Sequence, residues 1–222
     1  MEPGQKAINE TLFEAAEAGD VVAIEQALTA GAQITSHAGQ TRSTPLHCAA
    51  RSAHIDAIKV LLKAGAEIDA LDGDKDTALH WVAQQSTRFK GDYNGAAVAL
   101  LEAGAKVDAG NKRKMTPLHY ADKDVAESLL AAGANPIARD NEKRRPIDVA
   151  RNMKDAKLAD YLDSVATAET PRPTPNEVGL DMGKRNAALA ALGKRPVVGP
   201  QTASLQTVDL QRQRSIEKNE GI

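Results

Sequence analysis

The sequence is poor in the residues that most often carry chemistry or cross-link a fold. It holds one cysteine, Cys48, so no disulfide can form within the chain, which fits a reducing compartment. Aromatic residues make up 3% of the chain, and none follows Tyr161. No apolar run approaches the roughly 20 residues that a membrane helix needs, and MEPGQKAINE lacks the basic and apolar parts of a signal peptide. We therefore expect a cytoplasmic protein without membrane contact, and a secreted effector with a signal elsewhere is left open.

An excess of charge and the usual catalytic motifs are also missing. The chain has 28 Lys and Arg against 30 Asp and Glu, a net charge of −2, which does not indicate general affinity for nucleic acid or membranes. No phosphate-binding glycine loop, nucleophile elbow or HExxH motif occurs. Cys48 stands beside two alanines, so we interpret it as a small buried spacer and not as a nucleophile. We predict a protein that is not an enzyme, without metal or cofactor.

The C-terminal segment 166–222 lacks the apolar residues that a packed core requires. It is rich in Pro, Gly, Gln and charged residues, and such a composition does not offset the entropy of ordering the chain. We predict a disordered tail. Within it, GKRNAALAALGKRP at 183–196 joins basic pairs to a short amphipathic run. This run is either a docking element or a segment that its basic flanks keep soluble.

What the sequence does contain is a repeat. The heptapeptide occurs as TPLHCAA from Thr44, TALHWVA from Thr77 and TPLHYAD from Thr116. A Gly-Ala pair recurs at Gly31, Gly65, Gly104 and Gly133. Between these landmarks, Ile55, Ile58, Leu61 and Leu62 have helical spacing, and Gly65 follows where a left-handed residue would end the helix. The unit is therefore two short helices, a glycine stop and a polar connection, and such units must stack to bury their apolar faces.

These residues resemble the ankyrin repeat family. The T-P-L-H-x-A signature, the paired alanines and an ending of the type LLKAGAEIDA appear in order. The resemblance implies an all-α solenoid of helix-turn-helix units with short β-hairpin connections, followed by the disordered tail. We predict a repeat domain at 7–165. Its units are 9–38 as N-terminal cap, 39–71, 72–110, 111–139, and 140–165 as C-terminal cap.

The repeated histidine could belong to a metal site or to a joint between units. The resemblance implies that the threonine opens the first helix and that threonine and histidine bond each other and nearby backbone. Threonine is a good N-cap and proline suits the first helical position, which supports this interpretation. His47, His80 and His119 would then lie one per layer. A zinc site needs ligands that converge on one point, so we predict an architectural role.

The resemblance also implies a function. Such stacks bind another protein on a concave surface made of hairpin tips and first helices, so we predict a non-catalytic adaptor or scaffold that is a monomer alone. The implied contact residues are Gln40, Thr41, Ser43, Arg51, Ser52, Asp74, Asp76, Gln84, Gln85, Lys112, Arg113, Met115 and Arg144. The alternative is electrostatic binding of nucleic acid or a nucleotide by the basic tips of the last two units. No aromatic stacking platform is evident beside those tips, so a nucleic acid is not the expected partner.

The charges of the connections differ along the chain. EIDALDGDKD at 67–76 is acidic, whereas NKRKM at 111–115 and the end of RDNEKRR at 139–145 are basic. Neighbouring tips should lie about 10 Å apart, close to one Debye length at physiological salt, so opposite fields would persist side by side. We hypothesise a binding ridge that is acidic at the second and third units and basic at the fourth and fifth. The alternative is that the tips pair with one another.

The sequence departs from the family pattern at two places. The third unit gains QQSTRFKGDYNG at 84–95, while the fourth contracts at 120–127. Either Phe89 or Tyr93 packs into the space left by the shortened neighbour, or Arg88, Phe89 and Tyr93 anchor a partner on a protruding loop. The family often has glycine two residues before the threonine. Arg42, Lys75 and Lys114 stand there, which predicts less tightly formed connections.

Overall fold

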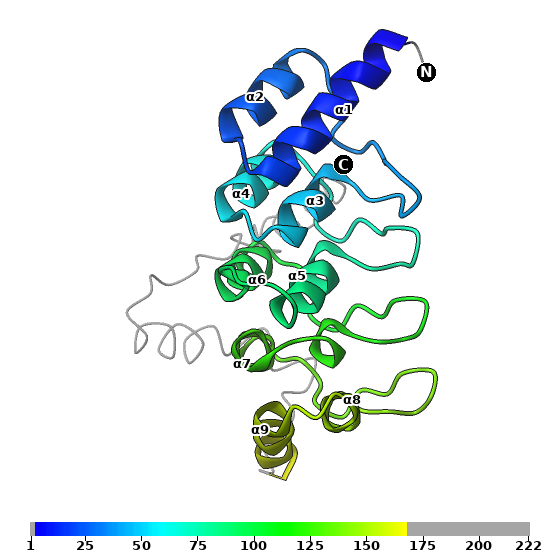
Figure 1. Cartoon of the computed structure of the whole chain (residues 1–222), viewed down its shortest axis with the longest axis vertical. Coiled ribbons are helices and arrows are strands. Elements are labelled where there is room, and N and C mark those ends of the chain that lie inside the picture. The colour runs from blue at the N-terminus through cyan, green and yellow to red at the C-terminus, as the bar shows by residue number, and fades with distance from the viewer. Residues whose placement is uncertain (1–2, 168–222) are drawn as a thin grey trace, which may run out of the picture. The chain divides into compact units, whose positions relative to one another are not determined.

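The structure is a computed structural model that describes residues 3–167. The described chain is all-α and forms a stack of helix pairs (Figure 1). Its elements are α1 (Pro3–Ala18), α2 (Val21–Thr29), α3 (Pro45–Arg51), α4 (Ile55–Lys63), α5 (Ala78–Ser86), α6 (Tyr93–Glu102), the 3₁₀ turn η1 (Pro117–His119), α7 (Lys123–Ala131), α8 (Pro146–Asn152) and α9 (Ala156–Thr167). The run 183–196 and most of the predicted tail lie outside the described residues.

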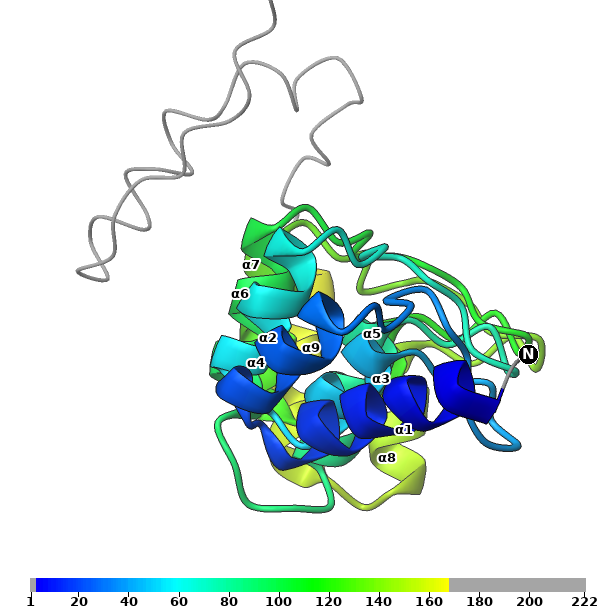
Figure 2. The same ribbon diagram turned by 90° about the horizontal axis from the view of Figure 1, so that it is seen from above.

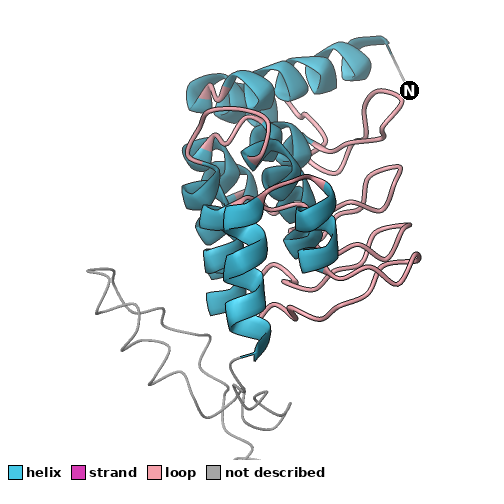
Figure 3. Cartoon of the chain, turned by 60° about the horizontal axis from the view of Figure 1, so that its bottom comes forward, coloured by secondary structure: helices cyan, strands magenta, loops and turns pink. Residues whose placement is uncertain are grey.

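The helices form two layers. The first helices α1, α3, α5, η1 and α8 contact one another in this order, and the second helices α2, α4, α6, α7 and α9 do the same. Seen from above, the two layers lie side by side, and the loops that connect successive units extend on the side of the first helices (Figure 2). The loops project clear of the helices (Figure 3). The predicted stack of helix-turn-helix units is confirmed.

The core runs through the stack because equivalent apolar positions of each unit are buried. Leu46, Leu79, Leu118 and Ile147, each the second residue of its first helix or turn, are at most 2% exposed. Between them lie small alanines, which allow the helices of neighbouring layers to approach closely. The prediction that glycine ends the second helix is confirmed, since Gly65 has φ 95°. Within the described residues, no helix is long and apolar enough to cross a bilayer.

Four connections between units extend as turns that we call fingers: finger 1 (38–43), finger 2 (72–76), finger 3 (111–115) and finger 4 (140–144). The prediction of loosely formed connections is wrong. Lys75 and Lys114 adopt the left-handed backbone conformation, with φ 61° and 56°, and their N–H groups close turns onto the carbonyls of Asp72 and Asn111 at 3.1 and 2.9 Å. Within the described part of the chain, an isolated β-bridge joins Ala38 to Ser43, and the other fingers are hydrogen-bonded turns.

Two units differ from the predicted plan. Helix α1 begins at Pro3, ahead of the predicted start of the first unit at residue 9. In the contracted fourth unit, the first helix is reduced to the three-residue turn η1, because Asp122 already caps the next helix through the N–H of Val125 at 2.9 Å. Shortening therefore removes the end of the first helix and leaves its start, with Thr116 and His119, intact.

Candidate protein-binding surface

Each threonine–histidine pair ties one layer to the next. In the third unit, His80 Nδ1 accepts from the Thr77 N–H at 3.1 Å and lies 2.9 Å from the Thr77 hydroxyl. Its Nε2 lies 3.0 Å from the carbonyl of Met115 in the next finger. His47 and His119 make the same set of contacts, with the carbonyls of Asp76 at 3.0 Å and Arg144 at 3.2 Å. The predicted architectural role of these histidines is confirmed.

The contacts also fix the protonation of each ring. A carbonyl can only accept, so Nε2 carries the proton, and Nδ1 must be bare to accept the backbone N–H of the threonine. The imidazole is therefore neutral. Burial lowers the pKa of His47, His80 and His119 below the ordinary value, which keeps the ring neutral at physiological pH. Both ring nitrogens are used within the stack, so none of the three is available as a metal ligand in this arrangement.

The fifth unit replaces this pair with an arginine and an aspartate. Arg145 occupies the threonine position, and its N–H donates to Asp148 Oδ2 at 2.9 Å. The Arg145 guanidinium also binds both carboxylate oxygens, each at 3.1 Å. These side-chain hydrogen bonds lower the pKa of Asp148 to about 2. The sequence showed aspartate in place of histidine here, but it did not reveal the partner.

Backbone hydrogen bonds link the fingers directly. The N–H of Gly73 donates to the carbonyl of Thr41 at 2.6 Å, and that of Lys112 donates to the carbonyl of Asp74 at 2.9 Å. The same link joins Asn141 to Arg113 at 2.8 Å. Gly73 is required by this approach, since a Cβ there would lie 2.9 Å from the Thr41 carbonyl oxygen. The fingers therefore form a row with a fixed spacing.

The acidic side chains of finger 2 are bound within the stack. Asp72 accepts from the Trp81 indole at 3.0 Å and from two backbone N–H groups of its own turn. Asp76 accepts from the side chains of Asn111 at 2.8 Å and Gln84 at 3.1 Å. These neutral partners fix the finger on the helix, and the two carboxylates are held inside the stack and not presented at its tip.

Two basic side chains of fingers 3 and 4, Lys112 and Arg144, form ion pairs. Lys112 lies 3.4 Å from Asp74 on the neighbouring finger. Arg144 lies 2.8 Å from Asp140 and 3.1 Å from Glu142 on its own finger. Burial alone would raise the pKa of Asp140, but hydrogen bonds from the backbone and side chain of Arg144 hold it below its usual value. These contacts favour the alternative in which the tips pair with one another.

The junction of fingers and first helices carries two pairs of an aromatic residue and an arginine. Arg51 and Arg113 are predicted contact residues, but their aromatic partners were missed. Trp81 follows the histidine of the third unit and lies half-buried, with the Arg51 guanidinium 5.8 Å from its ring centre. Tyr120 occupies the same position one unit later, and the Arg113 guanidinium lies 5.9 Å from its ring and donates to its hydroxyl at 2.7 Å. We call these four residues the aromatic–arginine face. The sequence signal that could have revealed Trp81 and Tyr120 was the aromatic residue at the variable position x of the T-P-L-H-x-A signature.

The structure divides the predicted contact residues into exposed and buried groups. Gln40, Thr41, Asp74, Lys112 and Arg113 are exposed on the fingers. Arg51, Ser52, Gln84 and Arg144 are partly exposed. The exposed set brings the finger tips and the ends of the first helices onto one side of the repeat domain, whereas the loop between α5 and α6 lies away from the fingers (Figure 2). Arg88 and Phe89 on that loop therefore belong to a separate surface.

Five of the predicted contact residues are buried, and the structure corrects these predictions. Ser43, Asp76 and Met115 each directly precede the threonine that caps a first helix or turn. The carbonyls of Asp76 and Met115 meet a histidine there, and the carbonyl of Ser43 accepts from the Ala38 N–H at 2.9 Å. Gln85 is 8% exposed near the end of α5. Tyr93 is 6% exposed and donates its hydroxyl to the carbonyl of Arg51 at 3.2 Å. None of the five presents its side chain to an external partner.

The inserted loop combines both alternatives proposed for it. Tyr93 packs, but it bonds Arg51 of the preceding unit and not the shortened unit that follows. Phe89 is 62% exposed, so it does not fill a space in the stack. An exposed phenylalanine beside Arg88 remains a candidate anchor for a partner.

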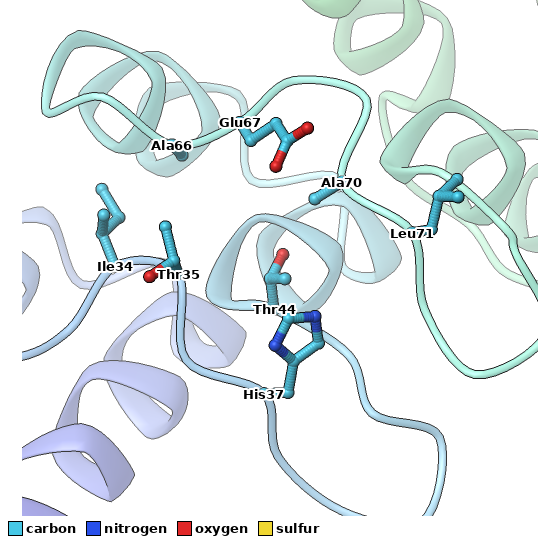
Figure 4. A pocket seen from close by; sticks show the side chains of 8 residues that line it. All are labelled: Ile34, Thr35, His37, Thr44, Ala66, Glu67, Ala70 and Leu71. Atoms are coloured by element: carbon cyan, nitrogen blue, oxygen red, sulfur yellow. The ribbon is translucent and has the colours of Figure 1, made fainter.

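A small pocket lies between the first two units (Figure 4). Ile34, Thr35 and His37 line it from one side, and Ala66, Glu67, Ala70 and Leu71 from the other, with Thr44 at its floor. Its volume of about 70 Å³ corresponds to two or three water molecules. Binding sites for organic cofactors are several times larger, so this pocket does not provide one.

Cys48 occupies the same signature position as Trp81 and Tyr120, one unit earlier, and is partly buried. Burial raises the pKa of its thiol to about 11. The thiolate is the nucleophilic form of cysteine, and at neutral pH it is almost absent from such a group. The interpretation of Cys48 as a spacer agrees with this environment.

Comparisons with known proteins agree with this geometry. The family described as "Ankyrin repeats (3 copies)" matches residues 12–109, and "Ankyrin repeat" matches residues 113–141. The ankyrin repeat protein FPV240 of Fowlpox virus (strain NVSL) is 37% identical over 68 residues, a match that covers 31% of this chain and 17% of the viral protein. The matched regions contain the three threonine–histidine pairs together with fingers 1 and 2. This chain belongs to the ankyrin repeat family.

Proposed function

We propose that this protein is a non-catalytic adaptor that binds another protein across its fingers and the exposed side of its first helices. Ankyrin repeats are in general protein-interaction modules, and the matched families support that class of function. The observation that carries the proposal for this chain is the aromatic–arginine face. Tryptophan, tyrosine and arginine are the residues most enriched among interface hot spots.

The geometry of this face suits recognition of a protein surface. Trp81 is held by its indole N–H on Asp72, and Tyr120 by Arg113 and by the Asn111 side chain at 3.0 Å. Side chains held in place before binding lose less conformational entropy on binding. Arg51 remains 40% exposed and Trp81 is half-buried, so both can contact a partner from fixed positions.

The alternative of electrostatic nucleic-acid binding has less support. Two of the basic residues assigned to it are ion-paired, Lys112 with Asp74 and Arg144 with Asp140. Tyr120 lies beside the tips, but Arg113 covers one face of its ring. Binding of single strands usually depends on open aromatic faces.

The test is affinity capture with three versions of the full chain. One carries Arg51→Glu and Arg113→Glu on the aromatic–arginine face. The matched control carries Lys59→Glu and Lys63→Glu on the exposed side of α4 in the second layer. Circular dichroism would verify that all three are folded.

We expect proteins captured by the unmodified chain to be lost at least about tenfold with the face variant and retained with the control, because charge reversal at a hot spot opposes docking. Equal capture by all three versions would contradict the proposed surface. Retention of RNA in place of protein, removed by nuclease, would contradict the proposed class of partner.

A further inference from the structure

Four cationic residues occupy the same turn position in four successive fingers. Arg42, Lys75, Lys114 and Lys143 each lie two residues before the N-cap of a first helix or turn. Their φ angles are 51°, 61°, 56° and 62°. All four are exposed, and within residues 3–167 none of their side chains takes part in an ion pair. We call this set the tip row.

The backbone at these positions suits glycine better than the residues present. A positive φ brings the Cβ of an L-residue close to its own backbone, and glycine avoids this strain. The N–H of Lys143 closes its turn onto the Asp140 carbonyl at 3.0 Å, as Lys75 and Lys114 do in theirs. The left-handed conformation is thus imposed by the turn, and a long cation is present despite it. Strained positions of this kind often mark a functional site.

The acidic residues near the tip row have other partners and form no ion pair with it within residues 3–167. Asp74 is paired with Lys112, and Glu142 is paired with Arg144. Asp72 and Asp140 accept from backbone N–H groups inside their turns. The exposed charge that remains at the left-handed positions is positive in every finger.

The spacing of the row follows from the backbone links between fingers. The distance from one tip residue to the next has two parts. One is the hydrogen-bonded contact between two fingers, and the other is the width of one finger, and each is about 4.8 Å, the spacing of paired backbone segments. The repeat is therefore close to 10 Å, and the four fingers stack in one direction (Figure 1). A ligand that matches the row needs a negative charge at about this interval on one side.

A polyproline II segment meets this requirement. It has three residues per turn and a rise of about 3.1 Å per residue, so every third side chain lies on the same side about 9.3 Å apart. In a flat β-strand, residues three apart point to opposite faces. Duplex DNA carries a charge about every 1.7 Å of its axis, which is far denser than the row.

We propose that the tip row binds an acidic polypeptide segment in the polyproline II conformation, with Asp or Glu at every third position. This inference rests on the proposed adaptor function and names one class of partner for it. Binding is electrostatic at the tips and is distinct from the aromatic–arginine face, so a partner can use either surface or both.

The test uses the full chain and fluorescence anisotropy with a synthetic peptide of four Glu-Pro-Pro units at low ionic strength. A second peptide has the same composition with its four glutamates adjacent. The main variant replaces all four tip residues by glycine: Arg42→Gly, Lys75→Gly, Lys114→Gly and Lys143→Gly. The control is Lys154→Gly, which removes an exposed cation with φ 62° from the loop between α8 and α9.

We expect the four-glycine variant to bind the spaced peptide about 30-fold more weakly, from four exposed charge pairs of about 0.5 kcal/mol each. Lys154→Gly should change the Kd less than about twofold. Because glycine relieves the left-handed strain, the melting temperature of the four-glycine variant should stay the same or rise. Loss of binding with unchanged or higher stability supports the proposal and separates it from unfolding.

Equal binding of the spaced peptide by the unmodified and four-glycine chains would overturn the proposal. It is also overturned if the adjacent-glutamate peptide or a single-stranded oligonucleotide of equal charge binds as tightly as the spaced peptide. The adaptor function is tested separately by the variant of Arg51 and Arg113, two residues outside the tip row. Equal capture of proteins by that variant and by the unmodified chain would contradict it. If the Arg51 and Arg113 variant loses a captured protein while the unmodified chain does not bind the spaced peptide, the adaptor function stands and the tip row has no part in it.

Discussion

Interior units and the fifth unit close the start of the first helix with different side chains. In the third unit, Thr77 and His80 form a neutral, buried set of hydrogen bonds that continues to the Met115 carbonyl of the next finger. In the fifth, Arg145 and Asp148 form a charged pair, each about one-third exposed, within the unit itself. The interior joint connects two layers, whereas the terminal joint connects a helix to its own cap.

The difference shows what the histidine is for. A ring that accepts at Nδ1 and donates at Nε2 bridges an N-cap and a carbonyl of the next finger, which a carboxylate cannot do because it only accepts. The described residues present no further finger beyond the fifth unit, so a bridge has nothing to reach there. An exposed ion pair then suffices, since it stays hydrated. Stability should therefore depend strongly on the interior joints and weakly on the terminal one.

The largest expected effect comes from breaking an interior joint. His80→Ala removes a fully buried side chain and leaves the Met115 carbonyl and the Thr77 N–H without their partner. We expect the free energy of unfolding to fall by about 3 kcal/mol, from lost hydrogen bonds and a cavity. Urea unfolding followed by circular dichroism measures this. The control His37→Ala, at an exposed histidine, should cost less than about 0.5 kcal/mol, and equal costs would contradict the comparison.

Acid should separate the two kinds of joint. The folded-state pKa values of His47, His80 and His119 are lowered, so the unfolded chain binds more protons below about pH 6.5. The stability from the interior joints is present above that pH and is lost as the pH falls toward the folded values. Asp148, with a pKa of about 2, loses its contribution only below about pH 4.

Thermal melts from pH 8 to pH 3 would measure this dependence. A flat melting temperature between about pH 7 and 5 would contradict the neutral, buried description of the three imidazoles. The variant Asp148→Asn serves as the comparison. It should lower the melting temperature by a similar amount at every pH above about 4, because the ionised carboxylate stabilises the folded chain there, and it should leave the fall between about pH 7 and 5 unchanged.

A smaller effect is expected from the terminal joint. Asp148→Ala removes the acceptor of the Arg145 N–H and of its guanidinium. We expect a loss of about 1 kcal/mol, as for other helix caps, because the freed Arg145 side chain can turn to solvent. Denaturant unfolding at neutral pH gives the value. A loss as large as that of His80→Ala would show that both joints carry equal weight.

The smallest change in the free energy of unfolding is expected at Phe89, on the inserted loop. Phe89→Ala removes a large apolar side chain that is mostly exposed, so we expect a change below about 0.5 kcal/mol. Tyr93→Phe, in the same insertion, removes the hydroxyl that binds the Arg51 carbonyl and should cost about 1 kcal/mol. If Phe89→Ala lowered the melting temperature more than Tyr93→Phe, the loop would pack differently from the arrangement described.

The interior joints were predictable because their residues repeat, and a resemblance to a known family gave them a role. The terminal joint was only half predictable. Asp148 was visible where a histidine would stand, but nothing in a single sequence marked Arg145 as its partner. Trp81 and Tyr120 occupy a variable position of the signature, so the repeat drew no attention to them.

Burial within the fingers was the least predictable property. Ser43, Asp76 and Met115 lie in polar connections whose composition indicates exposure. The burial of Asp76 and Met115 follows from the joint, because the residue before the threonine must point its carbonyl at a histidine one layer earlier. That constraint acts between units more than 25 residues apart in the chain, and no local pattern reports it.

The hydrogen bonds between fingers all run in one direction, from an N–H of the later finger to a carbonyl of the earlier one. This polarity makes the units interchangeable in series. If a copy of 72–110 were inserted after residue 110, the N–H of its finger would meet a carbonyl of the preceding finger, and its own carbonyl would meet an N–H of the following finger. The protein could thereby gain length, and further docking positions at a constant pitch, without the redesign of any existing contact.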